Sequence, residues 1–377
     1  MSKLRVLHVI GGGEYGGAEQ HILHLVTTLP RDEVEVAVVC FYDSLFASKL
    51  REAGIQVIPL HRFGRFDLRL MGALRETFRS FQPAVIHTHG VKANFFSRLA
   101  ARSLQVPLVT TVHSSLRFDY TGSLTYLIVS LMERGTRRWN HHYIAISGAL
   151  AAILRQQGVP EKQISVIYNG MDLAPYRQTL LREADRSRLR AEWNIPEQAF
   201  LFGTVARFVP VKGLPVLLEA FARLAADQQT PPFLVLVGDG PERGRLEEIV
   251  LEHRLEPLVR FVGFRQDIPA CLHACDAFVH SSLYEGLGYT LIEAMASEVP
   301  VVASNVGGVK EFVFDEQTGL VVPPGDPAAL RDAMERLWKS PALRETMVQN
   351  ALRKVENSFS IQLMTERILA LYKTLIP

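Results

Sequence analysis

Short apolar runs, most of them rich in Val and Ile, recur along the chain and are separated by segments of helical length. Runs that are apolar on both faces and alternate with helices indicate buried parallel strands in a doubly wound α/β sheet. In the first half the runs predict strands at residues 4–10, 34–40, 57–60, 85–87, 108–111, 143–146 and 166–168. In the second half they predict strands at residues 201–206, 233–237, 259–262, 277–280, 299–303 and 319–322.

The alternation of strands and helices is interrupted once, at the charged segment 171–197, which contains Pro175 and Pro196. Such a break indicates a junction between domains. Residues 340–377 contain no further strand pattern and predict two helices. We therefore expect two Rossmann-like domains, residues 1–172 with the C-terminal helix 358–377, and residues 173–357. Ligands of such sheets bind at the carboxyl ends of the strands.

Length and charge agree with this division. A chain of 377 residues is long enough for two cores, and its net charge is only +2, which argues against a nucleic-acid partner. The charge is unevenly distributed, because residues 1–170 hold 19 Lys or Arg against 12 Asp or Glu, and the remainder holds 22 against 27. A basic first domain and an acidic second domain are expected to attract different ligands.

The number of cysteines and the length of the apolar runs predict the cellular compartment of the protein. Cys40, Cys271 and Cys275 are too few for a disulfide framework, which favours a reducing, cytoplasmic setting. The apolar run at the N-terminus is short and ends in three glycines, which is typical of a first strand rather than a secretory signal. No run approaches the ~18 apolar residues of a membrane span, so we expect at most peripheral membrane contact.

The segment 281–297 has the strongest chemical pattern. It leaves a predicted strand, passes Gly286 and Gly288, and enters a predicted helix near Tyr289. Glycines let the backbone approach a ligand there, and the first N–H groups of the helix can bind phosphate. Glu285 in the loop and Glu293 in the helix are expected to face one pocket. The alternative is that acidic side chains are simply favoured near a helix N-terminus.

Here the chain resembles the retaining glycosyltransferases of family 4, which have the GT-B fold of two facing Rossmann-like domains. Their Glu-x7-Glu signature, with the segments that follow it, matches Glu285, Glu293, Ala294-Met295-Ala296, Pro300-Val301-Val302, Gly307-Gly308 and Glu311. Other family segments occur in order: Gly16-Gly17-Ala18-Glu19, Thr111-Val112-His113, Ile146-Ser147, Asn169-Gly170-Met171-Asp172, Arg207 with Lys212-Gly213, Gly238-Asp239-Gly240-Pro241 and Pro324-Gly325-Asp326. The resemblance covers nearly the whole chain.

The resemblance implies that the second domain binds a UDP-, GDP- or ADP-sugar. Departure of a nucleoside diphosphate needs positive charge or N–H groups at the leaving oxygen. Arg207 and Lys212 are expected to bind the diphosphate. The alternative is that they are two ordinary surface cations beside the start of a helix, which is disfavoured because a cation there opposes the helix dipole. No Asp-x-Asp occurs in the chain, so no metal and no cofactor is expected.

The remaining site residues also follow from the resemblance. Glu285, His113, Arg207 and Lys212 are the predicted catalytic residues, with Glu285 and His113 on the donor-sugar hydroxyls and Glu293 on the ribose. The predicted donor-binding residues are Gly16, Gly17, Arg207, Lys212, Phe264, Glu285, Gly288, Tyr289, Thr290 and Glu293. Gly16 and Gly17 are expected to approach phosphate from the first domain. Phe264 is expected beside the nucleobase, with Arg265 a weaker candidate; a core aromatic is the alternative.

Two clusters suggest metal binding, but other roles are favoured. His273 lies between Cys271 and Cys275 without a fourth ligand at zinc-finger spacing, so residues 268–275 predict a short buried helix. His87 and His89 are interpreted as a strand-end pair lining the cleft, with metal binding as the alternative.

The sequence departs from the family at two places. Leu287, Tyr289 and Thr290 replace residues common in relatives, which leaves the sugar undetermined. Glu298 stands where a glycine often precedes the following strand.

The basic first domain favours an anionic or lipid-linked acceptor, or an anionic membrane surface. Residues 124–132, followed by Arg134, Arg137, Arg138 and Trp139, could dock on a membrane, although a core helix with a basic end is favoured.

We therefore predict a cytoplasmic, metal-independent retaining transferase. It would move a hexose or hexosamine to a glycan, lipid-linked or small hydroxyl acceptor in cell-envelope or exopolysaccharide synthesis. The alternatives are an inverting GT-B transferase or sugar-nucleotide epimerase, and an inactive nucleotide-sugar-binding protein.

Overall fold

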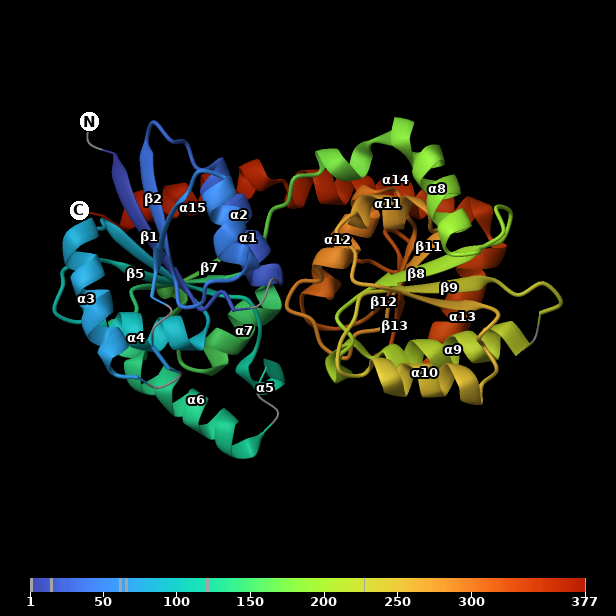
Figure 1. The fold of residues 1–377 in the computed structure, drawn as a ribbon, viewed down its shortest axis with the longest axis horizontal. Helices are drawn as coiled ribbons and strands as arrows, with labels where there is room; N and C mark the ends of the chain where they lie inside the picture. The colour runs from blue at the N-terminus through green and yellow to red at the C-terminus, as the bar shows by residue number, and fades with distance from the viewer. Residues whose placement is uncertain are drawn as a thin grey trace. The chain divides into compact units, whose positions relative to one another are not determined.

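The computed structural model describes residues 3–13, 16–60, 63–64, 67–119, 122–226 and 228–376. The chain forms two compact units (Figure 1). Unit 1 comprises Met1–Met171 with Phe359–Pro377, and unit 2 comprises Asp172–Ser358. Each boundary lies one residue from the position that the sequence pattern predicts.

Unit 1 is built on a seven-stranded parallel sheet in the order β3-β2-β1-β4-β5-β6-β7. Its strands are β1 (Leu4–Ile10), β2 (Val34–Cys40), β3 (Gln56–Pro59), β4 (Val85–His89), β5 (Leu108–Val112), β6 (His142–Ala145) and β7 (Ile164–Val166). Its helices are α1 (Gly17–Thr28), α2 (Leu45–Glu52), α3 (Arg69–Phe81), α4 (Val91–Ala101), α5 (Leu116–Asp119), α6 (Ser123–Thr136), η1 (Arg137–Trp139), α7 (Gly148–Gln156), η2 (Glu161–Gln163) and α15 (Ile361–Leu375). All seven predicted strands are present, and β7 begins two residues earlier than predicted.

The C-terminal helix α15 belongs to unit 1. The Met171 N–H donates to the Phe359 carbonyl at 3.0 Å, and the Ile361 N–H donates back to the Met171 carbonyl at 3.2 Å. From that point α15 packs its apolar face with α1 against the sheet, where Ile368 and Tyr372 are buried. Burial of this face is what attaches the last helix to the first unit.

Unit 2 is built on a six-stranded parallel sheet in the order β10-β9-β8-β11-β12-β13. Its strands are β8 (Leu201–Val205), β9 (Phe233–Val237), β10 (Val259–Gly263), β11 (Ala277–His280), β12 (Val301–Ser304) and β13 (Leu320–Val322). Its helices are η3 (Ala174–Arg177), α8 (Thr179–Glu192), η4 (Pro210–Lys212), α9 (Leu214–Ala226), α10 (Arg243–Glu252), α11 (Ile268–His273), α12 (Tyr289–Ala296), η5 (Gly307–Glu311), α13 (Pro327–Lys339) and α14 (Pro341–Ser358). Figure 1 shows helices on both faces of each sheet, as a doubly wound topology requires.

Each sheet reverses its strand order once. In unit 1 the reversal lies between β1 and β4, and in unit 2 it lies between β8 and β11. Loops leaving the two central strands diverge to opposite faces at such a point, and the space between them holds ligands in open α/β sheets. The loops after β1, β4, β8 and β11 are therefore the places to look for chemistry.

The segment of α11 is a short buried helix, as predicted. The Cys275 thiol contacts the Cys271 carbonyl at 3.2 Å, and His273 bonds to the Asp185 carboxylate and the Tyr176 carbonyl. Both thiols have raised pKa values because they are buried, Cys271 to about 12. Hydrogen bonds and burial therefore fix the positions of these side chains within unit 2.

Glu298, which stands where relatives often have glycine, adopts a left-handed backbone conformation with φ of +56°. The Arg182 guanidinium donates to the Glu298 carbonyl at 3.3 Å. This bond helps to hold a turn that is strained for a residue with a side chain.

Helix α6 differs from the favoured interpretation. Leu124 is 71% exposed and Leu131 is 60% exposed, and Leu127 and Ile128 between them are exposed as well. The prediction of a core helix is therefore wrong, because the apolar face of α6 is not covered by the rest of unit 1. Among the described residues, no helix is long and apolar enough to span a membrane.

Candidate functional site

The first candidate site lies at the strand reversal of unit 2 and is centred on an ion pair. Lys212 ends η4, after β8, and Glu285 lies in the loop after the neighbouring strand β11. The ammonium of Lys212 lies 2.7 Å from Glu285 Oε2. The structure thus brings together two of the predicted catalytic residues, which are 73 positions apart in sequence.

Backbone contacts between the two loops set this geometry. The Ser281 hydroxyl donates to the Lys212 carbonyl at 3.0 Å, and the Leu283 N–H donates to the Val211 carbonyl at 2.8 Å. Gly213, with φ of +61°, leaves the room that this approach needs, since a Cβ there would lie 2.3 Å from the Ser281 carbonyl oxygen.

A third loop supports Glu285 from the side of β12. Gly307 has φ of +46°, and a Cβ on it would lie 1.7 Å from the Glu285 carbonyl oxygen. The neighbouring Gly308 N–H points at the same oxygen at 3.4 Å. Two glycines of the Gly-Gly segment therefore allow this loop to pack against the backbone of Glu285.

His280 is part of this site, although sequence reasoning did not select it. Its Nε2 lies 3.3 Å from Glu285 Oε2 and 3.1 Å from the Ser282 hydroxyl. The available signal was its position as the last residue of a predicted strand that leads into the most informative loop. Polar residues at that place point to the ligand edge of a parallel sheet.

The charge state of Glu285 follows from these contacts. Burial alone would raise the pKa of its carboxyl group, but the ammonium of Lys212 and the hydrogen bond from His280 together lower that pKa to about 2. Glu285 is therefore an ionised, acceptor-only group near neutral pH. Such a carboxylate can hold hydroxyl groups, and the ammonium beside it can hold an anion.

Glu293 has a different partner from Glu285. It is buried in the second turn of α12, and its Oε1 accepts a hydrogen bond from the Tyr176 hydroxyl at 2.8 Å. Burial and the neighbouring Glu293 carboxylate raise the pKa of Tyr176 far above its ordinary value. No sequence signal linked these residues, which are 117 positions apart.

The other predicted donor-binding residues of unit 2 lie in loops or at the start of a helix at the same edge of the sheet. Gly288, with φ of +96°, precedes α12, and Tyr289 and Thr290 are the first two residues of that helix. Arg207 is exposed directly beyond β8. Phe264 is 67% exposed just after β10, so the alternative of a core aromatic is excluded.

Arg265, the weaker candidate beside Phe264, is engaged elsewhere. Its guanidinium bonds to both carboxylate oxygens of Asp267, at 2.8 and 2.7 Å, and to Glu192 at 2.6 Å. Because its guanidinium is occupied by these ion pairs, the observed role of Arg265 is structural.

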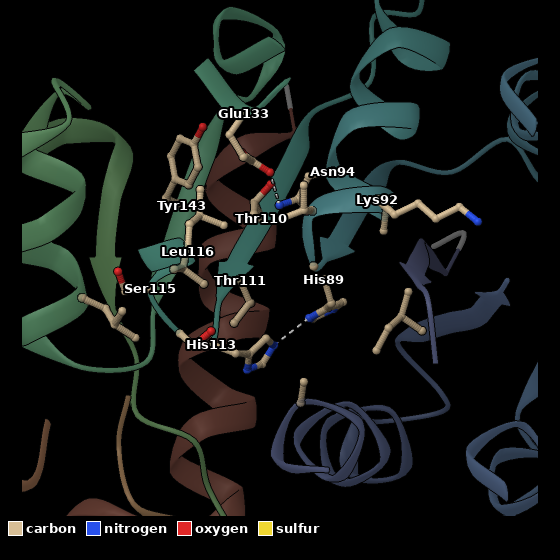
Figure 2. Close-up of a pocket in the computed structure, with 18 of the residues that line it drawn as sticks. His89, Lys92, Asn94, Thr110, Thr111, His113, Ser115, Leu116, Glu133 and Tyr143 are labelled. Carbon is tan, nitrogen blue, oxygen red and sulfur yellow. Dashed lines mark hydrogen bonds between the residues drawn. The ribbon is translucent and has the colours of Figure 1, made fainter. Parts of the chain in front are cut away.

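A second candidate site is a cavity of about 380 Å³ in unit 1 (Figure 2). Residues at the carboxyl ends of β1, β4 and β5 line it, among them Gly11, His89, Thr111 and His113. Glu133 from α6 also lines the cavity and accepts a hydrogen bond from the Asn94 amide at 2.9 Å. The cavity thus lies at the strand reversal of unit 1.

Gly16 and Gly17 start α1 at this reversal. Gly16 is the N-cap residue, and its N–H donates to the Glu19 carboxylate at 3.1 Å. The Glu19 side chain thus caps the first N–H of the segment that starts α1, although Gly16 has no side chain to complete a capping box, and Glu19 also lines the cavity.

His113 lies directly after β5, and Figure 2 shows its ring turned toward His89. The two rings are joined by a 3.2 Å contact between His89 Nδ1 and His113 Nε2. Burial lowers the pKa of His113 to about 4, so its ring is neutral near pH 7.

The interpretation of His87 as a cleft-lining residue is wrong. His87 is completely buried, with Nδ1 2.5 Å from the Tyr372 hydroxyl and Nε2 2.6 Å from the Thr111 hydroxyl. His87 and His89 are two residues apart in β4 and therefore lie on the same face of the sheet, as predicted. Helix α15 covers that face at His87, where Tyr372 contacts the ring. Only His89 of the pair lines the cavity.

Histidines gather around this pair. Among the described residues, two groups have the spacing of metal ligands, His8 with His87 and His89, and His21 with His89 and His113. Burial lowers the pKa of each of the five histidines, which keeps all of them neutral.

Two doubly wound units with polar loops at both strand reversals define the architecture of GT-B glycosyltransferases. The model of the group "Glycosyl transferases group 1" matches residues 185–354, and that of "Glycosyltransferase Family 4" matches residues 15–175. The α-D-kanosaminyltransferase of Streptomyces kanamyceticus is 30% identical over 79% of this chain and 79% of its own length. The chain belongs to this glycosyltransferase family and is a glycosyltransferase.

Two further similarities extend over almost the whole chain. The lipopolysaccharide core biosynthesis glycosyltransferase LpsD of Rhizobium meliloti is 28% identical over 98% of both chains. The crystal structure of Anabaena HepE in complex with UDP and glucose is 27% identical, covers 98% of this chain and 100% of its own, and superposes with a TM-score of 0.86.

Proposed function

We propose that this glycosyltransferase moves a hexose or hexosamine from a nucleotide diphosphate sugar to a hydroxyl acceptor with retention of anomeric configuration. The observation that carries the proposal is the Lys212–Glu285 ion pair at the strand reversal of unit 2. The ammonium of Lys212 can bind an anion, and the carboxylate of Glu285 beside it can bind hydroxyl groups. A sugar diphosphate carries both kinds of group, a diphosphate anion next to the hydroxyls of the sugar. The similar structure of HepE with UDP and glucose supports the same ligand class.

In the proposed mechanism unit 2 binds the donor. Arg207, Lys212 and the first N–H groups of α12 stabilise the charge that develops on the departing diphosphate, without a metal ion or another cofactor. Glu285 accepts hydrogen bonds from hydroxyls of the transferred sugar, and Glu293 accepts them from the ribose. Glu285 is tied to Lys212, so it acts by positioning rather than as a nucleophile, and the acceptor attacks from the face that the diphosphate leaves.

The acceptor is proposed to bind in the cavity of unit 1. Lys92 and Arg137 line that cavity among largely apolar neighbours such as Val91 and Leu116. This lining suits an acceptor with an anionic part and an apolar part, as a lipid-linked glycan has. Similarity to LpsD supports a role in cell-envelope or exopolysaccharide synthesis.

Thermal unfolding with a panel of UDP-, GDP- and ADP-sugars tests the donor assignment. A donor at about 100 times its Kd stabilises the folded protein by ~2.7 kcal/mol, so one nucleotide family should raise Tm clearly. Lys212→Met should lose most of that increase, because it removes the ammonium from the diphosphate site. If no member of the panel changes the Tm of the wild-type protein, the donor assignment is wrong.

The products distinguish the remaining alternatives. A retaining transferase gives the same anomer as the donor, whereas an inverting transferase gives the opposite one. An inactive binding protein would show the thermal shift but neither transfer nor slow hydrolysis of the donor.

We also propose that α6 holds the protein against an anionic lipid surface. Leu124, Leu127, Ile128 and Leu131 are exposed and recur at helical spacing, so they form one apolar stripe. Arg134 and Arg138 continue the stripe beyond its C-terminal end and are exposed to solvent. An apolar stripe that ends in cations is the pattern of a helix lying in the membrane interface.

Replacing Leu127 and Leu131 together with glutamate should reduce binding to vesicles of phosphatidylglycerol and phosphatidylcholine at least tenfold. Burial of each Leu in the interface contributes roughly 1.5–3 kcal/mol, and each added carboxylate is repelled by the lipid. Leu251→Glu is the matched control, because Leu251 is 60% exposed on α10 of unit 2. Flotation of the vesicles measures binding; equal binding by the double variant would refute a membrane role for α6.

A further inference from the structure

His21, beside the cavity residue His113, is a buried polar side chain that hydrogen bonds do not explain. It lies in α1 and is completely buried, and neither of its ring nitrogens has a partner among the described residues. Buried polar side chains are ordinarily hydrogen-bonded, and an exception can mark a place where an ion binds. The His21 ring stands edge-on to that of His113, with 5.1 Å between the ring centres. His21 therefore retains two nitrogen atoms that could ligate a metal.

Two more histidines bring a nitrogen close to His21. One ring nitrogen from each of His21, His89 and His113 lies within 4.8 Å of the other two. Three atoms at such separations all lie within about 2.8 Å of a common point, and Zn–N bonds measure about 2.0–2.1 Å. Each nitrogen would have to move by about 0.7 Å at most to bind one zinc ion there, which small side-chain rotations can supply.

One edge of this triangle already has the spacing of zinc ligands. His89 Nδ1 and His113 Nε2 lie 3.2 Å apart. Two nitrogens on one zinc ion at tetrahedral or octahedral angles lie roughly 2.8–3.4 Å apart, given the length of the Zn–N bond. In the metal-free protein the same contact is a hydrogen bond between the two rings. Zinc would replace the proton between them, and each neutral ring would keep its one proton on the nitrogen that does not bind the metal.

The three ligands determine the class of metal. Neutral imidazoles suit Zn²⁺ and the other late first-row divalent ions, whereas Mg²⁺ and Ca²⁺ prefer oxygen. Burial lowers the pKa of all three rings, and neutral imidazole is the form that binds a metal. His89 and His113 line the cavity, so water or a ligand can fill the fourth position of a tetrahedral zinc ion from that side. Glu19 lines the same cavity and brings a carboxylate to it.

A fourth histidine supports the group that contains His21, and the second group of histidines is less suitable. His8 Nδ1 lies 3.1 Å from His89 Nε2, and zinc-bound histidines usually have such a partner on the other ring nitrogen, which orients the ring. The second group replaces His21 and His113 by His8 and His87. Both nitrogens of His87 are already bonded, to the hydroxyls of Tyr372 and Thr111.

We propose that His21, His89 and His113 form a site for one zinc ion, and that zinc bound there reversibly inhibits the enzyme by occupying His113. The inhibition rests on the proposed function and on the predicted role of His113 at the donor-sugar hydroxyls, whereas the binding of zinc does not. Zinc is an inhibitor at this site and not a cofactor, which agrees with the metal-independent transfer proposed above.

Zinc binding is measured on the whole protein after removal of metals with EDTA, by competition with a chromogenic zinc chelator and without any sugar nucleotide. The wild type should bind one equivalent. Loss of an outer partner of a zinc ligand costs about 10–100-fold in affinity, so His21→Phe, which removes a ligand, should cost roughly a hundredfold or more. His24→Gln is the matched control in the same helix and should bind zinc like the wild type.

X-ray absorption at the zinc edge of the wild type identifies the ligands and does not depend on whether a variant folds. It should show imidazole nitrogens and no sulfur, in contrast to zinc held by Cys271 and Cys275 in unit 2. Sulfur ligands, or the absence of stoichiometric binding by the wild type, overturn the proposal. So does binding that is unchanged in folded His21→Phe but lost in His87→Gln, because the metal would then belong to the second group.

Inhibition is measured separately, as transfer or hydrolysis of the donor found in the thermal-shift panel. Saturating zinc should lower the rate roughly tenfold or more, because it removes at least one hydrogen bond to the sugar. EDTA should restore the rate, and Mg²⁺ at the same concentration should not change it. His21→Phe should keep its own zinc-free rate when zinc is added. Zinc that binds at the three histidines without changing the wild-type rate refutes the inhibitory role, whereas a donor panel without any response refutes the donor assignment alone.

Discussion

Lys212→Met lowers kcat for sugar transfer by about 10²- to 10³-fold, which is the loss seen when one group that stabilises a developing charge is removed. Methionine keeps the length and apolar stem of lysine but removes the ammonium that lies 2.7 Å from Glu285 Oε2. Two effects follow, because the diphosphate loses a cation and the Glu285 carboxylate loses the partner that lowers its pKa. Steady-state kinetics with the donor found in the thermal-shift panel measures the change.

Two variants control for charge and for stability. Lys212→Arg keeps the positive charge and should retain more activity than Lys212→Met. Lys339→Met removes an exposed lysine that is paired with Glu335 on α13, and it should leave kcat unchanged. A fall of less than threefold in Lys212→Met would show that this ammonium is not part of the catalytic machinery.

Gly307→Ala abolishes activity and lowers the free energy of unfolding of unit 2 by roughly 3 kcal/mol, a large effect for one methyl group. The new Cβ would lie 1.7 Å from the Glu285 carbonyl oxygen, which is a backbone atom and cannot swing aside. The loop that carries Glu285 must therefore move, and the carboxylate moves away from Lys212. Denaturant unfolding and transfer assays measure the two losses.

Gly263→Ala is the matched control for this substitution. Gly263 also has a positive φ, +72°, but a Cβ there meets nothing within 4 Å. Gly263→Ala should lower the free energy of unfolding by only about 1–2 kcal/mol, which is the penalty for a left-handed backbone at alanine, and the variant should remain active. Equal losses in both variants would mean that backbone strain, and not the contact with Glu285, explains the Gly307 effect.

Local patterns were sufficient to predict the elements. Strands such as β1, β2, β9 and β11 begin and end at the predicted residues, because a short run that is apolar on both faces and rich in β-branched residues is typical of a buried strand. The start of α12 at Tyr289 was also predictable, since a glycine loop directly precedes it. By contrast, α6 has the composition of a core helix, and composition does not reveal whether other elements cover a face.

Candidate residues were predicted as individuals, and their partners were not. The sequence indicated Glu285, Lys212 and Glu293, but neither the His280 contact nor the Tyr176 hydroxyl on Glu293. His8 carried no signal at all, because a histidine inside an apolar strand is ordinarily a satisfied core residue. Its contact with His89 depends on the pairing of β1 with β4.

The sequence by itself determined two doubly wound units, their boundaries within one residue, and the family, through an ordered series of short segments. Periodicity and turn chemistry act over a few residues, so they are readable without a structure. The tertiary structure decided which side chains meet: Lys212 with Glu285, Tyr176 with Glu293, and His8 with His89 and His113. These pairs depend on strand order and on loops that approach within van der Waals distance, and neither is encoded in local hydrophobic pattern.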